Sequence, residues 1–342
     1  MASPGAGGQG RKYPGRPFVG KSVEMTSLLA QSPDLQLPAP RSAGFFRWAL
    51  SRLKQYMRVQ PPPVSTAPAE QALYGFAQPM LGARVLLNDP ELLREALVPA
   101  LFMAGACALY ATVGGEHDHG WFRNFYTAFA TLAPLPSLIF ANHYARLAAQ
   151  IRWRLGFGAC GPREMPFGML LGRLVRQTLI VALGVIPFAA VWKIIPGLGQ
   201  YLSQAVLAAW ALHWVVADAF DDAQVLAPGE NLRESIRRDR DAGAPWFVRV
   251  MNTVSERLPR FAGRPLRAFA RLCDKLAMDS RGEISIMEKN RSISLGFGLS
   301  TAALLATPVL NLVFRPIILA ASSHLLGHLE QHEPHPPAPQ LR

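Results

Sequence analysis

Two short segments of the sequence combine basic or amide side chains with a helix start, an arrangement that can bind a small anion. The first is Asn88 to Arg94 (NDPELLR), in which Asn88 or Asp89 would cap a helix and Pro90 would be its first residue. The free backbone N–H groups of such a start, together with Arg94, can hold an anion. An ordinary capped helix without a ligand fits the same pattern.

The second segment lies within the C-terminal apolar run, where Asn311 and Arg315 are polar. A charge placed inside an apolar segment is energetically expensive and often marks a functional site. A long cationic side chain can also extend its charged end to the membrane surface, and both interpretations remain open. Lys193 has a similar position near the middle of an earlier apolar block.

No combination of residues indicates an enzyme, a metal site or a cofactor. The three cysteines lie far apart with no CxxC spacing, so neither a disulfide framework nor a zinc site is predicted. Four adjacent acidic and histidine residues at 116–119 cannot all face one ion, so we interpret them as a surface loop. Asp218, Asp221 and Asp222 end an apolar block, and we expect them to pair with arginine or to cap a helix.

The elements that would position these residues are membrane helices. The chain has 342 residues, is 50% hydrophobic and carries a formal net charge of +12, which favours a polytopic all-α membrane protein with basic polar parts. Because the basic residues flank apolar segments, anionic lipid explains them better than nucleic acid. We expect both termini in the cytoplasm and, from the Ala, Arg and Leu content, a bacterial inner membrane.

The apolar segments predict two spanning helices and two helical hairpins. The spans are expected at about 96–113 and 125–144, and the hairpins at 174–220 and 293–326, with a cytosolic insert at 221–292 between the hairpins. The hairpins either cross the bilayer or penetrate part of it. Their tips are expected near Gly197 and Asn311, because proline and glycine or asparagine interrupt the apolar runs there.

The polar regions carry basic amphipathic patterns. Residues 1–70 are predicted to be disordered, apart from a helix at 44–58 that lies either on an anionic membrane face or on the protein's own surface. A second basic amphipathic helix is expected around 261–273. Together, 71–329 would form the membrane domain and 330–342 a disordered tail.

The sequence resembles the CysZ-type sulfate permease family, which includes the etoposide-induced protein of the endoplasmic reticulum. The resemblance covers about residues 71–325 and is most specific near the C-terminus. It is carried by Arg291, Phe297-Gly298, Pro308-Val309-Leu310-Asn311, Pro316, Ala320-Ala321-Ser322, the tip Pro196-Gly197-Leu198-Gly199, and the stretch containing Asp218, Phe220, Asp221 and Asp222.

The resemblance implies two long spanning helices, two partly penetrating hairpins, a homo-oligomer and proton-linked sulfate uptake. The family's sulfate loop, Pro-Gly-Leu-Arg-Arg, matches Pro90, Glu91, Leu92, Leu93 and Arg94. Glu91 stands where the family has glycine, and Leu93 stands where it has arginine. A carboxylate at an anion site repels the ligand.

Two functions follow from these patterns. The first is a transporter or channel for a small anion such as sulfate, with six candidate binding residues: Asn88, Glu91, Leu92, Arg94, Asn311 and Arg315. The alternative is a non-transporting membrane scaffold or lipid-interacting protein that acts through its basic cytosolic helices. Glu91 favours the alternative, and Arg315 within an apolar run favours transport.

Overall fold

The structure, a computed structural model, describes residues 45–57, 66–114, 120–132, 138–193, 195–306 and 311–332. Within these residues the fold is all-α, apart from an antiparallel pair of two-residue strands, β1 (Gly161–Pro162) and β2 (Val225–Leu226). The all-α prediction is therefore confirmed. Residues 1–43 and 333–342, which were expected to be disordered, lie outside the described residues, whereas residues 68–70 and 330–332, also expected to be disordered, belong to helices that continue into the body.

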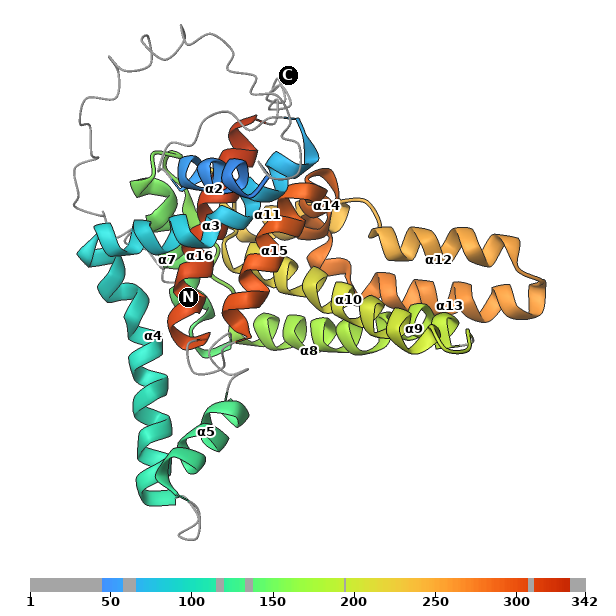
Figure 1. Ribbon diagram of the computed structural model, residues 1–342, viewed down its shortest axis with the longest axis horizontal. Coiled ribbons are helices and arrows are strands. Elements are labelled where there is room, and N and C mark those ends of the chain that lie inside the picture. The colour runs from blue at the N-terminus through green and yellow to red at the C-terminus, as the bar shows by residue number, and fades with distance from the viewer. Residues whose placement is uncertain are drawn as a thin grey trace, which may run out of the picture.

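Helices of very different lengths make up the fold (Figure 1). In chain order they are α2 (Phe45–Tyr56), α3 (Pro68–Asn88), α4 (Pro90–Leu109) with a π-helical turn (Tyr110–Gly114), α5 (Trp121–Leu132), α7 (Ala141–Arg154), α8 (Phe167–Gly184), α9 (Ile186–Lys193), α10 (Gly199–Asp222), α11 (Leu232–Asp241), α12 (Trp246–Arg257), α13 (Arg260–Leu276), a 3-10 turn (Met278–Ser280), α14 (Arg281–Lys289), α15 (Arg291–Leu305) and α16 (Asn311–His332).

Helix α3 packs against both α15 and α16, and these contacts form the centre of the body. Glycines allow the close approach: a Cβ on Gly75 would overlap the carbonyl oxygen of Ile293, and one on Gly82 would overlap that of Ile317. From the other side, a Cβ on Gly296 would overlap the carbonyl oxygen of Ala72. Small residues that bring backbones together are typical of helix packing in membrane proteins.

Much of the C-terminal apolar run is buried inside the protein. In α16 the continuous stretch from Ile318 to Leu326 is at most 5% exposed, and α3 packs on both arms of the expected hairpin. Neither α15 nor α16 is among the helices long and apolar enough to cross a membrane. The two arms expected at 293–326 are present as α15 and α16, and their insertion into a membrane stays a prediction; residues 307–310 between them lie outside the described residues.

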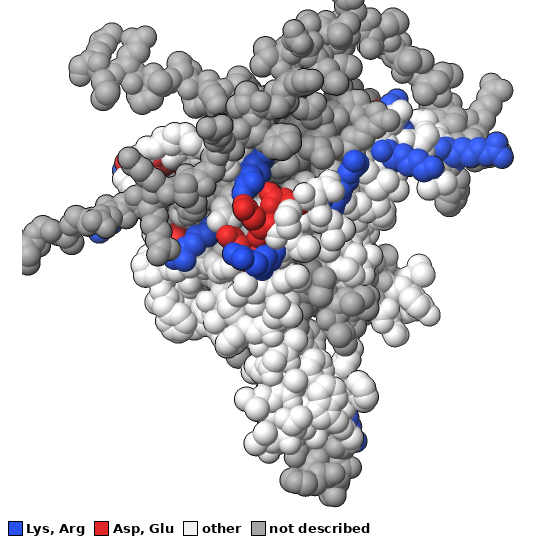
Figure 2. Space-filling view, turned by 90° about the vertical axis from the view of Figure 1, so that its left-hand side faces the viewer, with Lys and Arg blue, Asp and Glu red and all other residues white. Residues whose placement is uncertain are grey.

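Three helical segments in the described part of the chain are long and apolar enough to cross a membrane: Pro90–Gly114, Phe167–Trp192 and Gly199–Asp222. They form two projections from the body, α4 with α5 and α8–α9 with α10, which leave it in different directions (Figure 1). Figure 2 shows the α4–α5 projection almost free of charged side chains, whereas charges gather at its base. Such exposed apolar surface is compatible with a membrane protein.

The second expected span is not one helix. Residues 125–144 are divided between α5, which ends at Leu132, and α7, which begins at Ala141. Pro134 and Pro136 belong to this interval, and proline lacks the N–H that would continue a helix. In place of the single span, the structure shows separate helices of 12 and 14 residues.

The first expected hairpin is present as an antiparallel pair. The chain reverses between α9 and α10, where Gly197 has φ +76° and Gly199 N–H donates to the Ile195 carbonyl at 2.9 Å. A positive φ is readily adopted only by glycine, so the Pro196-Gly197 signal specifies the reversal. The trailing α10 packs on α9 and more lightly on α8.

The predicted amphipathic helix at 44–58 packs on the protein itself. Helix α2 lies against α3, where Tyr56 is buried and contacts Tyr74 edge to face. Arg52 also pairs with Glu70 at 3.1 Å. Of the two interpretations that the sequence left open, the structure shows the helix on the protein surface.

We predict that Gly75→Ala destabilises the protein by at least about 3 kcal/mol, because the added methyl group overlaps a backbone oxygen that cannot rotate away. Gly105→Ala in α4 is the matched control: its Cβ meets no atom within 4 Å, and alanine favours the helix. The measurement is thermal unfolding of both variants in detergent, followed by size-exclusion chromatography. Equal unfolding midpoints for the two variants would contradict the close-packing argument.

Candidate functional site

The start of α4 is already occupied by the protein's own carboxylate. Asp89 caps the helix and accepts hydrogen bonds from the N–H groups of Glu91 at 3.1 Å and Leu92 at 3.2 Å. Asp89 or Asn88 was the predicted cap and Pro90 the predicted first residue, and Asp89 with Pro90 is what the structure shows. Arg154 of α7 then pairs with Asp89 at 3.3 Å and with Glu91 at 2.5 Å.

The other candidates at this junction do not converge on these groups. Asn88 is exposed at the end of α3, and Leu92 is buried in the hydrophobic core. Arg94 is exposed, and no carboxylate among the described residues pairs with it. Two carboxylates against one arginine at the helix start disfavour an anionic ligand there.

Arg315 lies in the second turn of α16 and forms ion pairs within the protein. Its guanidinium is 3.0 Å from Asp222 and 3.7 Å from Asp218, both near the end of α10. It also stacks over the ring of Tyr144 at 5.5 Å from the ring centroid. The expected pairing of these aspartates with arginine is confirmed. The side chain of Asn311 lies outside the described residues.

A buried ionic network, which the sequence analysis did not predict, joins the base of the α8–α10 projection to the body. Glu283 of α14 is fully buried and lies 2.7 Å from Arg173 of α8, which also pairs with Asp221 at 2.7 Å. Arg163, just before α8, pairs with Asp239 of α11. The only signal in the sequence was isolated acidic residues within an arginine-rich insert.

A cavity of about 290 Å³ lies beside this network. Its wall includes four arginines and two aspartates: Arg163, Arg173, Arg176, Arg240, Asp239 and Asp279. Arg163 is 5% exposed, and its Nε and Nη1 atoms have no hydrogen-bond acceptor among the described residues. Burial and the nearby Glu283 raise the pKa of Asp239 to about 6, although Arg163 opposes that shift. The cavity could hold a small anion.

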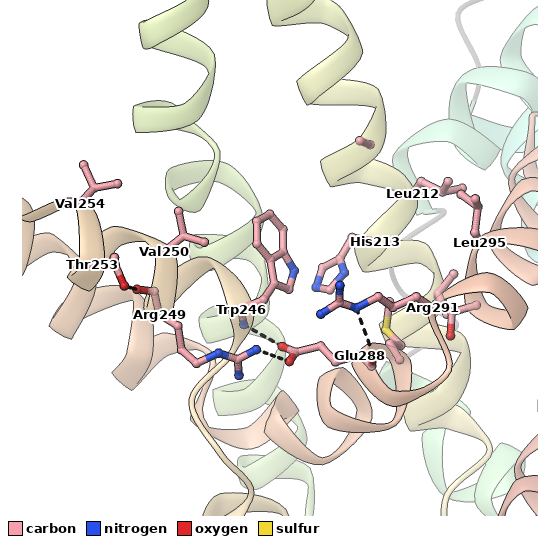
Figure 3. A pocket seen from close by; sticks show the side chains of 14 residues that line it. Leu212, His213, Trp246, Arg249, Val250, Thr253, Val254, Glu288, Arg291 and Leu295 are labelled. Carbon is pink, nitrogen blue, oxygen red and sulfur yellow. Dashed lines mark hydrogen bonds and ion pairs between the residues drawn. The ribbon is translucent and has the colours of Figure 1, made fainter. Parts of the chain in front are cut away.

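A larger pocket of about 690 Å³ lies between α10, α12, α14 and α15 (Figure 3). Most of its wall is apolar, and its charged residues are Arg249, Glu288 and Arg291. Glu288 accepts a hydrogen bond from the Trp246 backbone N–H at 2.7 Å and pairs with Arg249. A pocket with apolar walls and a basic group at one end fits an amphiphile.

Helix α13 carries an exposed basic stripe, as the sequence predicted for a basic amphipathic helix around 261–273. The stripe is defined by residues that recur every three or four positions: Arg260, Arg264, Arg267, Arg271 and Lys275. Among the described residues no carboxylate pairs with any of them. Phe261 (83% exposed) and Leu272 (44% exposed) lie beside the stripe, about three turns apart.

Comparisons with protein-family profiles, with curated proteins and with solved structures found no match. The membership predicted from the sequence resemblance therefore remains a prediction.

We predict that Glu283→Gln destabilises the protein by about 3–5 kcal/mol, because it removes one partner of a buried ion pair and leaves the arginines under-compensated. Glu91→Gln is the control: its side chain is 75% exposed, and an exposed pair contributes at most about 1 kcal/mol. Unfolding of the two variants in detergent tests this, and equal midpoints would show that the network contributes nothing.

Proposed function

We propose that this chain is an integral membrane protein that binds the anionic surface of the bilayer through its α12–α13 hairpin. The observation that carries the proposal is the basic stripe of α13, which pairs with no carboxylate of the described residues and lies beside exposed Phe261 and Leu272. Basic residues near an anionic leaflet contribute about 1 kcal/mol each, so the five together would hold the hairpin at the headgroups. This is the lipid-interacting alternative of the sequence analysis.

Helix α4 is the best candidate to cross the bilayer. Residues 96–114 carry no charged side chain, and a helix of that length spans about 28 Å, close to the hydrocarbon thickness. Leu101, Phe102 and Val113 are more than half exposed, as lipid contact requires. The charged residues of the segment, Glu91, Arg94 and Glu95, all lie at the end nearest the body.

The surroundings of the α8–α10 pair favour a shallower position in the bilayer for this pair than for α4. Helix α13 packs on α8, and α12 and α13 extend from the body on the same side as α8–α10 (Figure 1). If α8 and α10 stood along the bilayer normal, the arginines of α13 would be drawn toward hydrocarbon at several kcal/mol each. An oblique pair within the cytoplasmic leaflet keeps that stripe at the headgroups and agrees with a partly penetrating hairpin.

We predict that a nitroxide at Phe261→Cys enters the acyl-chain boundary in nanodiscs containing phosphatidylglycerol. The background is Cys160→Ser, since Cys107 and Cys273 are buried. The label should be more accessible to oxygen than to a water-soluble nickel reagent. This difference should disappear in pure phosphatidylcholine, and also in the Arg264→Gln/Arg267→Gln variant. The charge-matched control is Arg233→Gln/Arg237→Gln in α11, whose arginines are also exposed. A label that is equally accessible to the nickel reagent in both lipids would refute the proposal.

Small-anion transport is the second candidate, and the 290 Å³ cavity favours it because buried Arg163 has unused hydrogen-bond donors there. Gly172 lines this cavity, and a Cβ on it would meet no atom within 4 Å, so Gly172→Leu adds a side chain at the cavity wall whose Cβ has room. Gly105→Leu on the exposed side of α4 is the control.

We predict that, if sulfate passes through this cavity, Gly172→Leu abolishes radiolabelled sulfate uptake into proteoliposomes while Gly105→Leu and Arg94→Ala retain it. Loss with Arg94→Ala alone would move the anion site back to the start of α4. Absence of uptake by the unsubstituted protein would eliminate the transport candidate.

A further inference from the structure

The pocket between α10, α12, α14 and α15 changes from polar to apolar along its length. On α10, His213 lies nearer the body, and Ala209 lies nearer the reversal at Gly197. On α12, Trp246 begins the helix, and Val254 lies two turns further out. Among the residues that line the pocket, His213 and Trp246 therefore lie nearer the body than Ala209 and Val254, while α12 itself continues outward to Ser255, Glu256 and Arg257.

The polar end is assembled from three helices. Figure 3 shows the side chains of His213, Trp246 and Arg291 converging, with Val250 and Val254 to one side on α12. Arg249 is already engaged, since it pairs with Glu288 and donates to the Ala244 carbonyl. With two arginines against one glutamate, the charges in the wall sum to +1.

Three groups at this end have unused hydrogen-bonding capacity. Arg291 donates only through Nε, to the Glu288 backbone carbonyl at 3.2 Å, and no carboxylate among the described residues pairs with it. Ser294 lines the pocket and is 6% exposed, but its hydroxyl has no partner among the described residues, and the same holds for the buried Nε2 of His213. Buried polar groups are nearly always hydrogen-bonded, so these groups indicate a ligand.

We propose that this pocket binds one anionic phospholipid, with its phosphate at Arg291, Ser294 and His213 and an acyl chain along α10 and α12. The apolar walls and the volume of about 690 Å³ suit a chain far better than a bare inorganic ion. The inference rests on the proposed function, because an α8–α10 pair within the leaflet sets the polar end of the pocket at headgroup depth. It goes further in assigning one lipid to a defined site.

The test is native mass spectrometry of the delipidated full-length protein in detergent, titrated with phosphatidylglycerol or with phosphatidylcholine of the same chains. One phosphatidylglycerol should bind at least tenfold more tightly than phosphatidylcholine. Arg291→Gln should abolish that preference and Arg291→Lys should largely keep it. Ala209→Trp, which fills the apolar end, should weaken both lipids. Arg291 and Ala209 are exposed at the surface, so the variants are expected to fold, and matching elution profiles check this.

Two further arms separate the possible failures. Inorganic phosphate at the same concentrations should not displace the lipid; displacement at equal concentration would make this a small-anion site and overturn the proposal. Arg264→Gln/Arg267→Gln should leave the one-to-one binding unchanged in detergent, although it should release the nitroxide from anionic nanodiscs. Absence of the nanodisc effect alone contradicts the membrane-surface proposal. Absence of lipid binding, or lipid binding that Arg291→Gln leaves unchanged, overturns the proposed lipid site in the pocket.

Discussion

The rest of the structure depends on the buried ionic network at the base of the α8–α10 projection. Arg173 and Glu283 are both buried, and they connect the projecting helices to α14, while Arg163 and Asp239 connect the start of α8 to α11. Ions buried in this way are stable only when paired, so the helices must meet in one register. The network also limits how deeply these helices can enter a membrane. The ends of α8 and α10 that carry the network cannot enter hydrocarbon, whereas the apolar remainder of both helices can.

Local signals in the sequence were enough to predict the ends of elements and the faces of helices. Asp89 and Pro90 begin α4 because capping and a fixed φ act within one turn, and Gly197 reverses the chain because of its own backbone freedom. The arginines of α13 share a face because of helical periodicity alone. Such features need no knowledge of the rest of the chain.

Predictions that required knowledge of the surroundings were less successful. Hydropathy does not distinguish an apolar helix that faces lipid from one that faces protein, so the packing of α3 on α16 could not be predicted. The central position of α3 depends on glycines meeting backbone oxygens of distant helices. The partner of Arg315, Asp222, is 93 positions away, and the large pocket is formed by four helices, so neither could be located from spacing.

The same positions explain why the proposed lipid site lies where it does. Along α10 a largely apolar run from Ala205 to Val216 is followed by the acidic residues Asp218, Asp221 and Asp222, so the end of the helix nearest the body is more headgroup-like than its middle. On α12 the residues that line the pocket run from Trp246 and Arg249 to Val250 and Val254, beyond which the helix ends in Ser255, Glu256 and Arg257. A phospholipid has the same order of polar and apolar groups. A pocket whose lining residues follow this order fits one lipid molecule, whereas the smaller arginine-rich cavity beside α8 fits a compact anion.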